Sequence, residues 1–417
     1  MRINHHPSTI IHLWSIILLS LVLFLSCSRR IDLNRIVIWH QMRVDERVIL
    51  EGQMKRYMQL HPDVKLEAIY KETEELRSGF IIAAIAGQGP DLVYGPSDQV
   101  GPFQVMNIIK PMESLFTKAW LDSFNPKGIT WYKGHLYQIA DKLGNHLTLV
   151  YNKKLILQPP QTDEELVTIG KNLTVDANDD GRFEQYGLVW NYTEPFFFIP
   201  FMTGFGGWVM DDDGKPTLDN RGVIDGLNFI KDLRDRYKII PKESDYNIAD
   251  ALFKDGKAAM IINGDWSWAG YKKAGIDIGI APLPKIVKTG LWCSPMVSPK
   301  GYSINVNVSK EKDKIVVDVL KYLLQPENQL ETAKQLNTMP TWKALYDDPF
   351  IKNDEILKNS QIQIDRGRPM PVVPELRAIW DAMRPSYQAV LGGVKTPEQA
   401  AKDMQSLAMR KIAEMNE

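Results

Sequence analysis

Three stretches of this sequence pair aromatic rings with side chains that carry charge. Glu194 is followed, after a proline, by Phe196; Trp266 follows the sequence Asn-Gly-Asp; and Trp380 lies four residues before Arg384. Sugars display hydroxyls around the ring edge and C–H patches on each face. A sugar site therefore needs flat aromatics together with carboxylates, amides or guanidinium groups that form hydrogen bonds. These residue types in this pattern predict carbohydrate binding.

Core packing is the alternative explanation for each tryptophan, because tryptophan is mostly buried in any protein. The chain has 11 tryptophans. Trp208 and Trp268 are interpreted as core residues. For Trp266 and Trp380 we favour a binding role, on the family resemblance described below. Trp380 shares a helix face with the arginine four residues on, although the proline at 385 leaves helix continuity open.

Strands and helices alternate along the chain. A chain of 417 residues is too long for one ordinary core, so two lobes are expected. Alternation of this kind is typical of a parallel sheet with helices on both faces, whose ligands lie at the carboxyl ends of strands or between domains. Strands are expected at 36–39, 64–68, 92–94, 258–262 and 278–280, with helical periodicity through 50–58, up to 86, through 223–237, and after the capping box of Thr396 and Gln399.

The N-terminus has the pattern of a secretory signal. An apolar run from 10 to 25 is too short for a comfortable membrane span and ends just before Cys27. This junction resembles the lipobox of bacterial lipoproteins, in which the cysteine is lipidated. We expect a signal peptide at 1–26 and a lipid-anchored tether at 27–34. A plain signal peptide cut nearby, or an uncleaved anchor, is the alternative.

Composition and missing motifs narrow the function. The net charge is −1, so no basic excess indicates nucleic acid as a partner. No G-x-S-x-G, H-E-x-x-H or Walker A pattern occurs, so nothing in the sequence argues for an enzyme. Cys293 is the only cysteine besides Cys27, and lipid on Cys27 would leave it without a disulfide partner. We interpret Cys293 as a buried small hydrophobe.

One segment resembles the opening of a calcium-binding EF-hand loop. Its candidate ligands are Asp176, Asn178, Asp180 and Glu184, with Gly181 at the turn position. Gly187 stands where a bidentate glutamate is needed. The alternative is an Asx-rich surface turn without any metal. If calcium binds here, we expect a structural role, and the ligand site itself needs no cofactor.

Short segments spread over most of the mature chain resemble, in the same order, the maltose/maltodextrin-binding proteins of ABC importers. They are Ile36-Val37-Ile38-Trp39, Gly89-Pro90-Asp91-Leu92, Tyr151-Asn152-Lys153, Glu194-Pro195-Phe196-Phe197, Asp245-Tyr246-x-Ile248-Ala249, Ala259-Met260-x-Ile262-Asn263-Gly264-x-Trp266-x-Trp268, Gly367-x-x-Met370-Pro371 and Trp380-x-x-x-Arg384. Their shared order is specific for the binding-protein family and less specific for maltose.

The resemblance implies a two-lobe, periplasmic-binding-protein-like α/β fold that binds sugar between its lobes. Each lobe is expected to be a mostly parallel sheet flanked by helices, with hinge segments between the lobes. We expect the first lobe at 35–145 plus about 295–348, and the second at 146–294 plus about 349–417.

The second lobe retains the residues that face the ligand in this family. By resemblance, Glu194 binds sugar hydroxyls, and Phe196 (a tyrosine in the maltose binders), Trp266 and Trp380 stack on the rings. Three further residues are expected to face the cleft: Tyr246, Met370 and Arg384.

The first lobe departs from the family pattern. The altered positions are Gly95 for a tryptophan, Asp98-Gln99 for an Asp-Arg pair, Arg43 (with Asp45 nearby) for an aspartate, and Asn145 (with Asp141 nearby) for a glutamate. We take Asp98 and Asn145 as the first-lobe candidates for ligand binding. A lost stacking surface and changed polar partners move specificity between oligosaccharides.

We therefore expect an extracytoplasmic, membrane-anchored lipoprotein that captures an oligosaccharide and delivers it to the permease subunits of an ABC importer. It is expected to act as a monomer without catalysis. Two other functions stay open: a sensor subunit that presents its ligand to a membrane receptor, and a glycoside-processing enzyme in which paired carboxylates act as acid and nucleophile.

Overall fold

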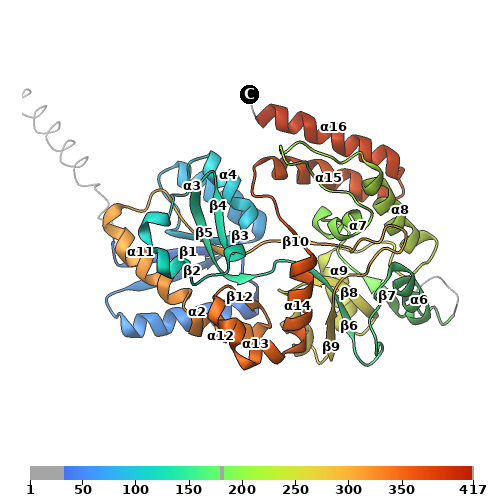
Figure 1. Cartoon of the computed structure of the whole chain (residues 1–417), viewed down its shortest axis with the longest axis horizontal. Helices are drawn as coiled ribbons and strands as arrows, with labels where there is room; N and C mark the ends of the chain where they lie inside the picture. The colour runs from blue at the N-terminus through green and yellow to red at the C-terminus, as the bar shows by residue number, and fades with distance from the viewer. Residues whose placement is uncertain (1–31, 179–182, 416–417) are drawn as a thin grey trace, which may run out of the picture.

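The computed structural model describes residues 32–178 and 183–415. The predicted signal peptide, Cys27 and Asp180 lie outside the described residues. Figure 1 shows two lobes beside one another, each containing a sheet flanked by helices. This arrangement confirms the predicted two-lobe α/β fold. Among the described helices, none has both the length and the apolar composition needed to cross a membrane.

The first lobe is built on a seven-stranded sheet of order β12-β5-β11-β3-β1-β2, with β4 paired to β5. Its strands are β1 (Arg35–His40), β2 (Lys65–Tyr70), β3 (Leu92–Pro96), β4 (Ile129–Tyr132), β5 (His135–Leu143), β11 (Lys300–Ile304) and β12 (Met339–Pro340). Its helices are α2 (Val44–Leu60), α3 (Thr73–Ile85), α4 (Val100–Val105), α5 (Lys118–Leu121), α11 (Lys310–Leu323) and α12 (Pro326–Leu336).

Alternation along the strands divides the first-lobe core between two faces. Leu92 and Tyr94 of β3 pack with α2 and α11, whereas Val93 packs with α3 and α4. Successive side chains of a strand point to opposite faces, so a strand covered on both sides is apolar at every position. This explains why the 92–94 run is continuously apolar.

The second lobe has a four-stranded sheet of order β7-β8-β6-β9. Its strands are β6 (Leu147–Asn152), β7 (Tyr186–Val189), β8 (Ala258–Gly264) and β9 (Ile278–Ala281). Its helices are α6 (Asp163–Leu173), α7 (Ile199–Gly204), α8 (Arg221–Asp235), α9 (Tyr246–Lys254), α10 (Trp268–Lys273), α14 (Glu355–Arg366), α15 (Glu375–Leu391) and α16 (Pro397–Met415). The short helix α13 (Pro349–Asn353) packs with α12 and β12 of the first lobe as well as with α14.

Two details of the second lobe refine the sequence analysis. The helical face through 223–237 ends earlier than expected, because α8 stops at Asp235. In contrast, α15 continues through Pro385, where the core packing of Met383 and Tyr387 outweighs the lost backbone hydrogen bond. The predicted capping box is present: Gln399 N donates to Thr396 Oγ1 (3.2 Å) and Thr396 N donates to Gln399 Oε1 (3.2 Å).

The expectation of mostly parallel sheets is wrong. In the first lobe only β1–β2 and β1–β3 are parallel, while β11, β12 and β4 pair antiparallel. In the second lobe β7–β8 is parallel, and β6 pairs antiparallel with β8 and β9. Parallel pairs come from local strand–helix–strand units. The strand β11 instead enters from the other lobe, so that Lys300 at its start pairs with Pro96 at the end of β3.

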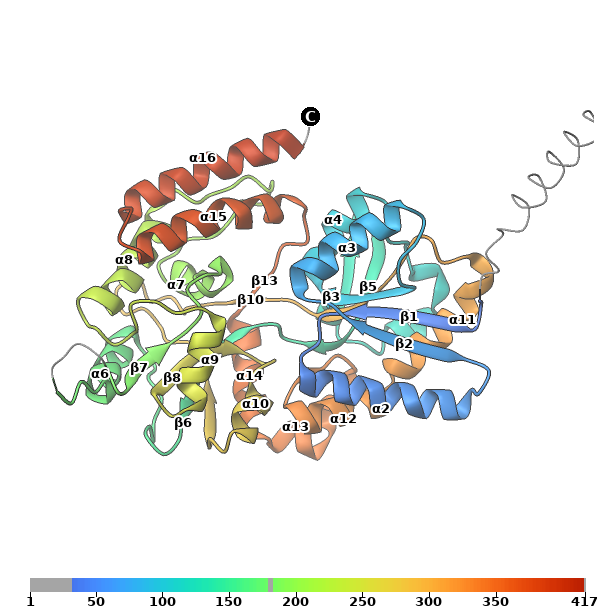
Figure 2. The ribbon, with the colours of Figure 1, turned by 180° about the vertical axis from the view of Figure 1, so that it is seen from behind.

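The lobes are joined by segments that meet in the middle of the molecule (Figures 1 and 2). One runs from β5 to β6 through Gly144 and Asn145, both at positive φ (134° and 43°). Another carries β10 (Met296–Val297), which pairs parallel with β13 (Arg368–Pro369). Asn145 Nδ2 donates to Ser298 Oγ at 3.1 Å, and Ser298 N donates to Gly144 O at 3.0 Å. These bonds hold two of the connecting segments together.

The described residues also include five short 3-10 turns: η1 (Ser97–Gln99), η2 (Glu113–Leu115), η3 (Pro126–Gly128), η4 (Pro195–Phe197) and η5 (Lys343–Asp347).

Candidate functional site

A cleft of about 360 Å³ lies between the lobes and is lined from both sides. Every residue that the sequence analysis assigned to ligand binding lines it: Asp98, Asn145, Glu194, Phe196, Tyr246, Trp266, Met370, Trp380 and Arg384. Residues that are far apart in the chain thus come together in one concave space between domains, where small ligands bind. Asp45 and Asp141, the alternatives in the first lobe, are not among its lining residues.

The aromatic wall of the cleft belongs to the second lobe. Trp266 follows β8, and its Nε1 donates to Tyr246 Oη at 3.2 Å, which fixes both rings. A Cβ added to Gly264 would lie 2.1 Å from the Trp266 ring, so glycine is required at that position. The ring of Phe196 lies 6.4 Å from that of Trp266. Trp380 is only 8% exposed and lies at the edge of the core, with one part facing the cleft.

The two tryptophans that the sequence analysis assigned to the core, Trp208 and Trp268, do not line the cleft. Trp268, the first residue of α10, is fully buried, and the His146 ring packs edge-on against its ring with the centroids 5.9 Å apart. Trp208 is half-buried against the second-lobe core, with the Arg368 guanidinium 4.0 Å above its ring. Cys293 is buried, and burial raises the pKa of its thiol, which agrees with a packing role.

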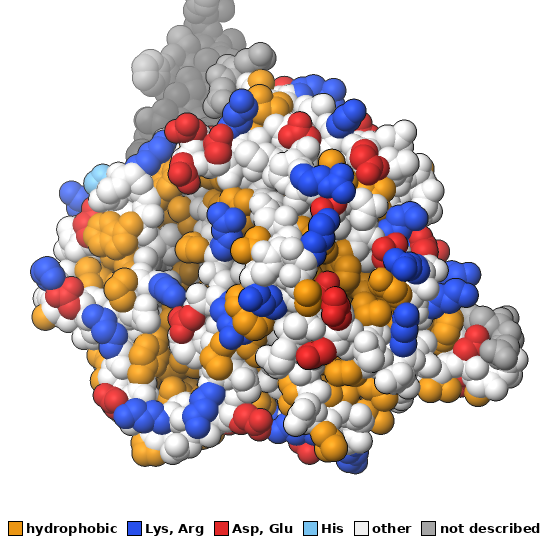
Figure 3. Space-filling model, turned by 45° about the vertical axis from the view of Figure 1, so that its right-hand side comes forward, with side chains coloured by type: hydrophobic (Ala, Val, Ile, Leu, Met, Phe, Trp, Pro, Cys, Tyr) orange, Lys and Arg blue, Asp and Glu red, His pale blue; other side chains and the backbone are white. Residues whose placement is uncertain are grey.

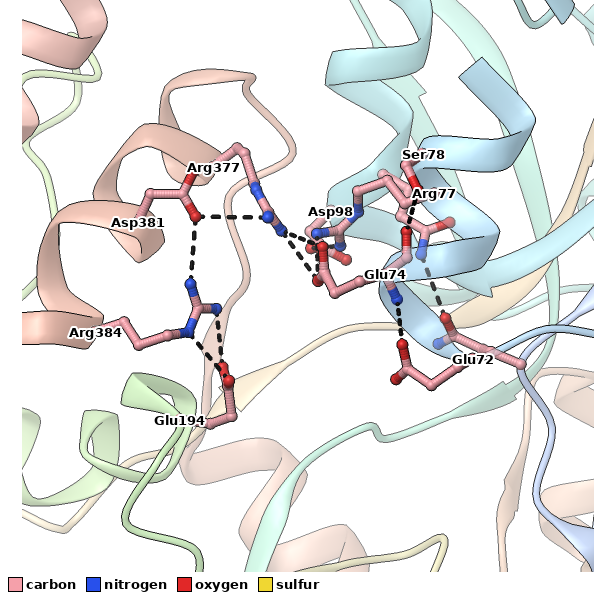
Figure 4. Close-up of polar contacts among 11 residues, drawn as sticks. Glu72, Glu74, Arg77, Ser78, Asp98, Glu194, Arg377, Asp381 and Arg384 are labelled. Atoms are coloured by element: carbon pink, nitrogen blue, oxygen red, sulfur yellow. Dashed lines mark hydrogen bonds and ion pairs between the residues drawn. The ribbon is translucent and has the colours of Figure 1, made fainter. Parts of the chain in front are cut away.

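A bidentate ion pair stands beside the aromatic wall. Arg384 Nε and Nη2 donate to Glu194 Oε1 and Oε2 at 3.1 and 3.0 Å (Figure 4). Glu194 precedes the 3-10 turn η4, whereas Arg384 comes from α15. The hydrogen bonds to Glu194 raise the pKa of Arg384, so this guanidinium stays charged. It presents fixed acceptors and donors at the rim of the cleft.

The first lobe contributes a second ion pair to the cleft, between Arg77 and Asp98. Arg77 Nη2 of α3 donates to Asp98 Oδ2 at 3.1 Å, and both side chains are nearly buried. Burial raises the pKa of Asp98, although the Arg77 charge acts in the opposite direction. Asp98 Oδ1 and Arg77 Nε are buried without a hydrogen-bond partner. An unpaired acceptor and an unpaired donor within one ion pair suit a hydroxyl, which can both donate and accept.

Two first-lobe cations lie over the second-lobe rings. The Arg43 guanidinium lies 4.7 Å from the centroid of the Tyr246 ring, and Lys300 Nζ lies 5.0 Å from that of Trp266. Sequence reasoning noted Arg43 only as a departure from the family and missed Lys300. Both contacts join the two lobes, and cations are attracted to aromatic faces.

A buried ion pair supports the first-lobe side of the cleft. Lys142 Nζ of β5 contacts Glu46 Oε1, and Arg43 N donates to Glu46 Oε2 at 2.7 Å. Burial acts to raise the pKa of Glu46, but Lys142 and Lys300 outweigh it and lower the pKa to about 2. Glu46 therefore stays charged in the folded protein.

The missing first-lobe tryptophan is replaced by a different side chain. A Cβ added to Gly95 would lie 2.6 Å from Gln99 Oε1, so the Gln99 amide fills the space beside this glycine. Gln99 is buried and does not line the cleft. The first lobe thus has a buried neutral amide beside the position where the family pattern has an aromatic platform.

The segment predicted to bind calcium lies between α6 and β7 in the chain, and only its two flanks are described. Ala177 N donates to Glu184 Oε2 at 2.9 Å, and Val175 pairs with Gln185 as an antiparallel bridge. Within residues 32–178 and 183–415, no group of three or more His, Cys, Asp or Glu side chains is arranged to hold a metal ion. Asp180 of the predicted ligand set is not described, so the calcium hypothesis stays a prediction.

Comparison with known proteins identifies the family. Residues 52–359 match the family model described as bacterial extracellular solute-binding protein. The chain belongs to this family. This solute-binding protein is 29% identical over 372 residues to the maltotriose-binding protein of Pyrococcus abyssi, covering 88% of this chain and 79% of that one. It is 27% identical over 359 residues to the galactooligosaccharide-binding protein of Bacillus subtilis, covering 81% and 80%.

A solved structure gives a stronger match. The maltose/maltodextrin-binding domain of Bdellovibrio bacteriovorus, bound to maltotriose, is 46% identical to this solute-binding protein. The TM-score is 0.87, and the match covers 91% of this chain and all of the other. The fold is thus shared with a protein that was solved with a bound oligosaccharide.

Proposed function

We propose that this solute-binding protein captures a neutral oligosaccharide of the maltodextrin type and delivers it to the membrane subunits of an ABC importer. The observation that carries the proposal is the gathering, in one interlobe cleft, of a second-lobe aromatic wall and of hydrogen-bonding ion pairs from both lobes. The maltotriose held by the Bdellovibrio relative makes maltotriose the first ligand to test.

The charge of the cleft favours a neutral ligand. Five basic and five acidic side chains line it: Arg43, Arg77, Lys300, Arg377, Arg384, Glu46, Glu72, Glu74, Asp98 and Glu194. An anionic or cationic sugar would leave one sign in excess, at a cost that buried unpaired charges impose. Basic and acidic side chains are also interspersed over the face shown in Figure 3, and the net charge is −1. No basic field for nucleic acid is implied.

Binding is proposed to act by hinge closure. A ligand shifts the balance toward the closed form only if it contacts both lobes there. Glu194, Trp266 and Arg384 would bind it from the second lobe, and Asp98 from the first. Asn145 belongs to the hinge and lines the same cleft, so its surroundings would change both when the ligand binds and when the lobes close. No cofactor takes part in this mode of binding.

The test is a titration of the mature domain followed by intrinsic tryptophan fluorescence, because Trp266 and Trp380 line the cleft. The panel contains maltotriose, maltose, trehalose and oligosaccharides of galactose, mannose and xylose. Saturable binding of maltotriose with little response to the others supports the proposal. Saturation only by a galactose oligosaccharide would keep the binding role and change the sugar, and no response from folded protein would refute carbohydrate binding.

The two other functions are separated by different experiments. An enzyme needs an acid and a nucleophile or base flanking the glycosidic bond, whereas Glu194 is held by two bonds from Arg384. We therefore propose binding without hydrolysis, which chromatography of maltotriose after long incubation checks. Uptake of labelled ligand by cells that lack this protein separates an importer subunit from a sensor subunit. Loss of an importer subunit should abolish uptake, whereas loss of a sensor subunit should leave uptake unchanged.

We further propose that the protein is a monomer anchored through lipid on Cys27. The family is extracellular by description, and Cys27 ends the apolar run of the predicted signal. Replacing Cys27 with alanine should release the protein from membranes and abolish incorporation of labelled fatty acid. Retention of the label would contradict the assignment of this cysteine.

A further inference from the structure

An unbroken run of alternating carboxylates and guanidinium groups crosses the cleft (Figure 4). In order it comprises Glu194, Arg384, Asp381, Arg377, Glu74, Arg77 and Asp98. Its two ends are the two carboxylates that the sequence analysis assigned to the ligand, one in each lobe. We call this run the cross-cleft ion chain.

Helix α15 supplies the second-lobe half of the chain. Arg377, Asp381 and Arg384 are spaced i, i+4 and i+7, so they lie on one helix face. Asp381 Oδ1 accepts from Arg384 Nη1 at 3.3 Å and lies 3.5 Å from Arg377 Nη2. Trp380, on the same helix, lines the cleft. The spacing therefore connects the Glu194–Arg384 pair to a guanidinium that points toward the first lobe (Figure 4).

Helix α3 supplies the first-lobe half. Glu74, in the first turn, accepts from Arg77 Nη1 at 3.2 Å, and Arg77 reaches Asp98 with its other terminal nitrogen. A carboxylate in the first helical turn is also stabilised by the helix dipole. The relative position of the Arg77 and Glu74 side chains is thus fixed within helix α3 and does not depend on the position of the other lobe.

The middle link is the contact between lobes. Arg377 Nη1 lies 3.0 and 2.9 Å from the two oxygens of Glu74. The side chains are 34% and 52% exposed, so water replaces the contact when the lobes separate. Every other link joins residues of the same lobe. Only this one can form and break as the cleft closes and opens.

We propose that Glu74 and Arg377 are positioning residues whose ion pair forms only in the closed cleft, stabilises closure, and aligns the carboxylates at the two ends of the chain for the ligand. This proposal rests on the binding function proposed above. Because an apparent dissociation constant scales inversely with the closed fraction, the pair tunes affinity through closure, and no contact between the pair and the sugar is required.

Salt gives the proposal a distinctive signature. A neutral ligand releases no counterions, so its affinity should hardly depend on ionic strength unless closure itself forms an ion pair. Exposed ion pairs are weak and screened by salt. We expect maltotriose binding to weaken about 2- to 5-fold between about 20 mM and about 500 mM salt, and removal of the pair to weaken it by a similar factor at low salt.

The experiment compares Glu74→Gln, Arg377→Gln and the double variant with Asp403→Asn. Asp403 pairs with Lys395 at 2.7 Å, with exposures of 53% and 35% that match the cross-cleft pair, but both partners are in the second lobe. Small-angle X-ray scattering of the ligand-free proteins at both salt concentrations reports closure without any sugar. Calorimetry with maltotriose reports affinity.

We expect both single variants and the double variant to be equally expanded, to bind about 2- to 5-fold more weakly at low salt and to lose the salt dependence, while Asp403→Asn behaves as the wild type. Unchanged scattering and unchanged salt response in the single variants would overturn the proposal. If the wild type does not bind maltotriose, the proposed function fails, and the scattering arm still decides whether the pair controls closure.

Discussion

The two faces of the cleft are built differently. The second-lobe face is aromatic, with Phe196, Tyr246 and Trp266 beside one bidentate ion pair. The first-lobe face has no aromatic side chain among the described lining residues; its charges include Arg43, Arg77 and Lys300. The second lobe thus offers flat surfaces for sugar rings together with one hydrogen-bonding pair, whereas the first lobe offers hydrogen-bonding groups without a ring surface, so recognition of the ligand needs both lobes together.

The largest effect is expected from the buried ion pair beneath the first-lobe face. Glu46→Gln should lower the free energy of unfolding by about 3–5 kcal/mol, because Lys142 would be left as an unpaired buried charge. Urea denaturation measures this. Glu51→Gln, an exposed position on the same helix, should change stability by less than about 0.5 kcal/mol. Equal effects of the two changes would show that the pair does not support this face.

Acid should remove the same contribution. The pKa of Glu46 is lowered from 4.5 to about 2 in the folded protein. Its stabilisation is therefore present above pH 4.5 and is lost as the pH falls from there toward 2.

The second-lobe face is tested through its stacking ring. Trp266→Ala should weaken oligosaccharide binding by about 2–3 kcal/mol, on the order of 30- to 150-fold, as expected for a central tryptophan contact. Calorimetry with maltotriose measures the change. Trp131→Ala, a half-exposed tryptophan of β4 outside the cleft, is the control and should bind normally. Normal binding by both variants would remove Trp266 from the site.

Each lobe buries one histidine, and both should make stability depend on pH. Burial lowers the pKa of His146 in the second lobe and of His40 in the first from 6.5 to about 4, with Asp265 opposing the shift at His146. The contribution of each neutral histidine to the free energy of unfolding is fully present above pH 6.5. It falls as the pH drops toward 4, because the histidine of the unfolded chain takes up a proton at a higher pH than the buried one does. The loss is on the order of 2 kcal/mol for each histidine.

Urea denaturation between pH 7 and pH 4.5 measures this slope. His146→Gln and His40→Gln should each reduce it, and the double variant should reduce it further. A slope that survives both substitutions would assign the acid sensitivity to other groups.

The smallest effect is expected where a first-lobe cation covers a second-lobe ring. Arg43→Ala should weaken ligand binding by about 1 kcal/mol, because the contact with Tyr246 closes the cleft. Arg47→Ala is a matched control, since Arg47 lies 4.4 Å from the Tyr70 ring within the same lobe. Calorimetry should show normal affinity for the control. Identical affinities of both variants would exclude Arg43 from closure.

The second-lobe face could be read from the sequence because its residues sit in short continuous segments. Glu194 and Phe196 follow one strand, and Trp266 follows another, so local order already placed them at strand ends. The strands and helices were equally readable from their periodicity. The chain also kept glycine at 264, where the tryptophan ring leaves no room for a side chain.

The first-lobe face could not be read in this way. Arg77 lies on a helix whose charges look like an ordinary solvated face, and its partner Asp98 comes from another element. The link from this helix to the second lobe depends on Arg377, which lies 303 residues beyond Glu74 along the chain. Lys300 starts a strand that returns from the other lobe, so its place over Trp266 depends on the hinge. The same return explains the mixed sheet: strand direction was set by crossings between lobes, which periodicity does not reveal.

The most direct test of the account is a crystal structure of the protein with maltotriose. We predict that the sugar lies between the lobes and stacks on Trp266. Its hydroxyls should form hydrogen bonds with both the Glu194–Arg384 pair and the Asp98–Arg77 pair. One hydroxyl should accept from Arg77 Nε and donate to Asp98 Oδ1, the two buried atoms of that pair that have no hydrogen-bond partner among the described residues. A ligand that touches only the second lobe, or that binds outside this cleft, would contradict the claim that recognition needs both faces.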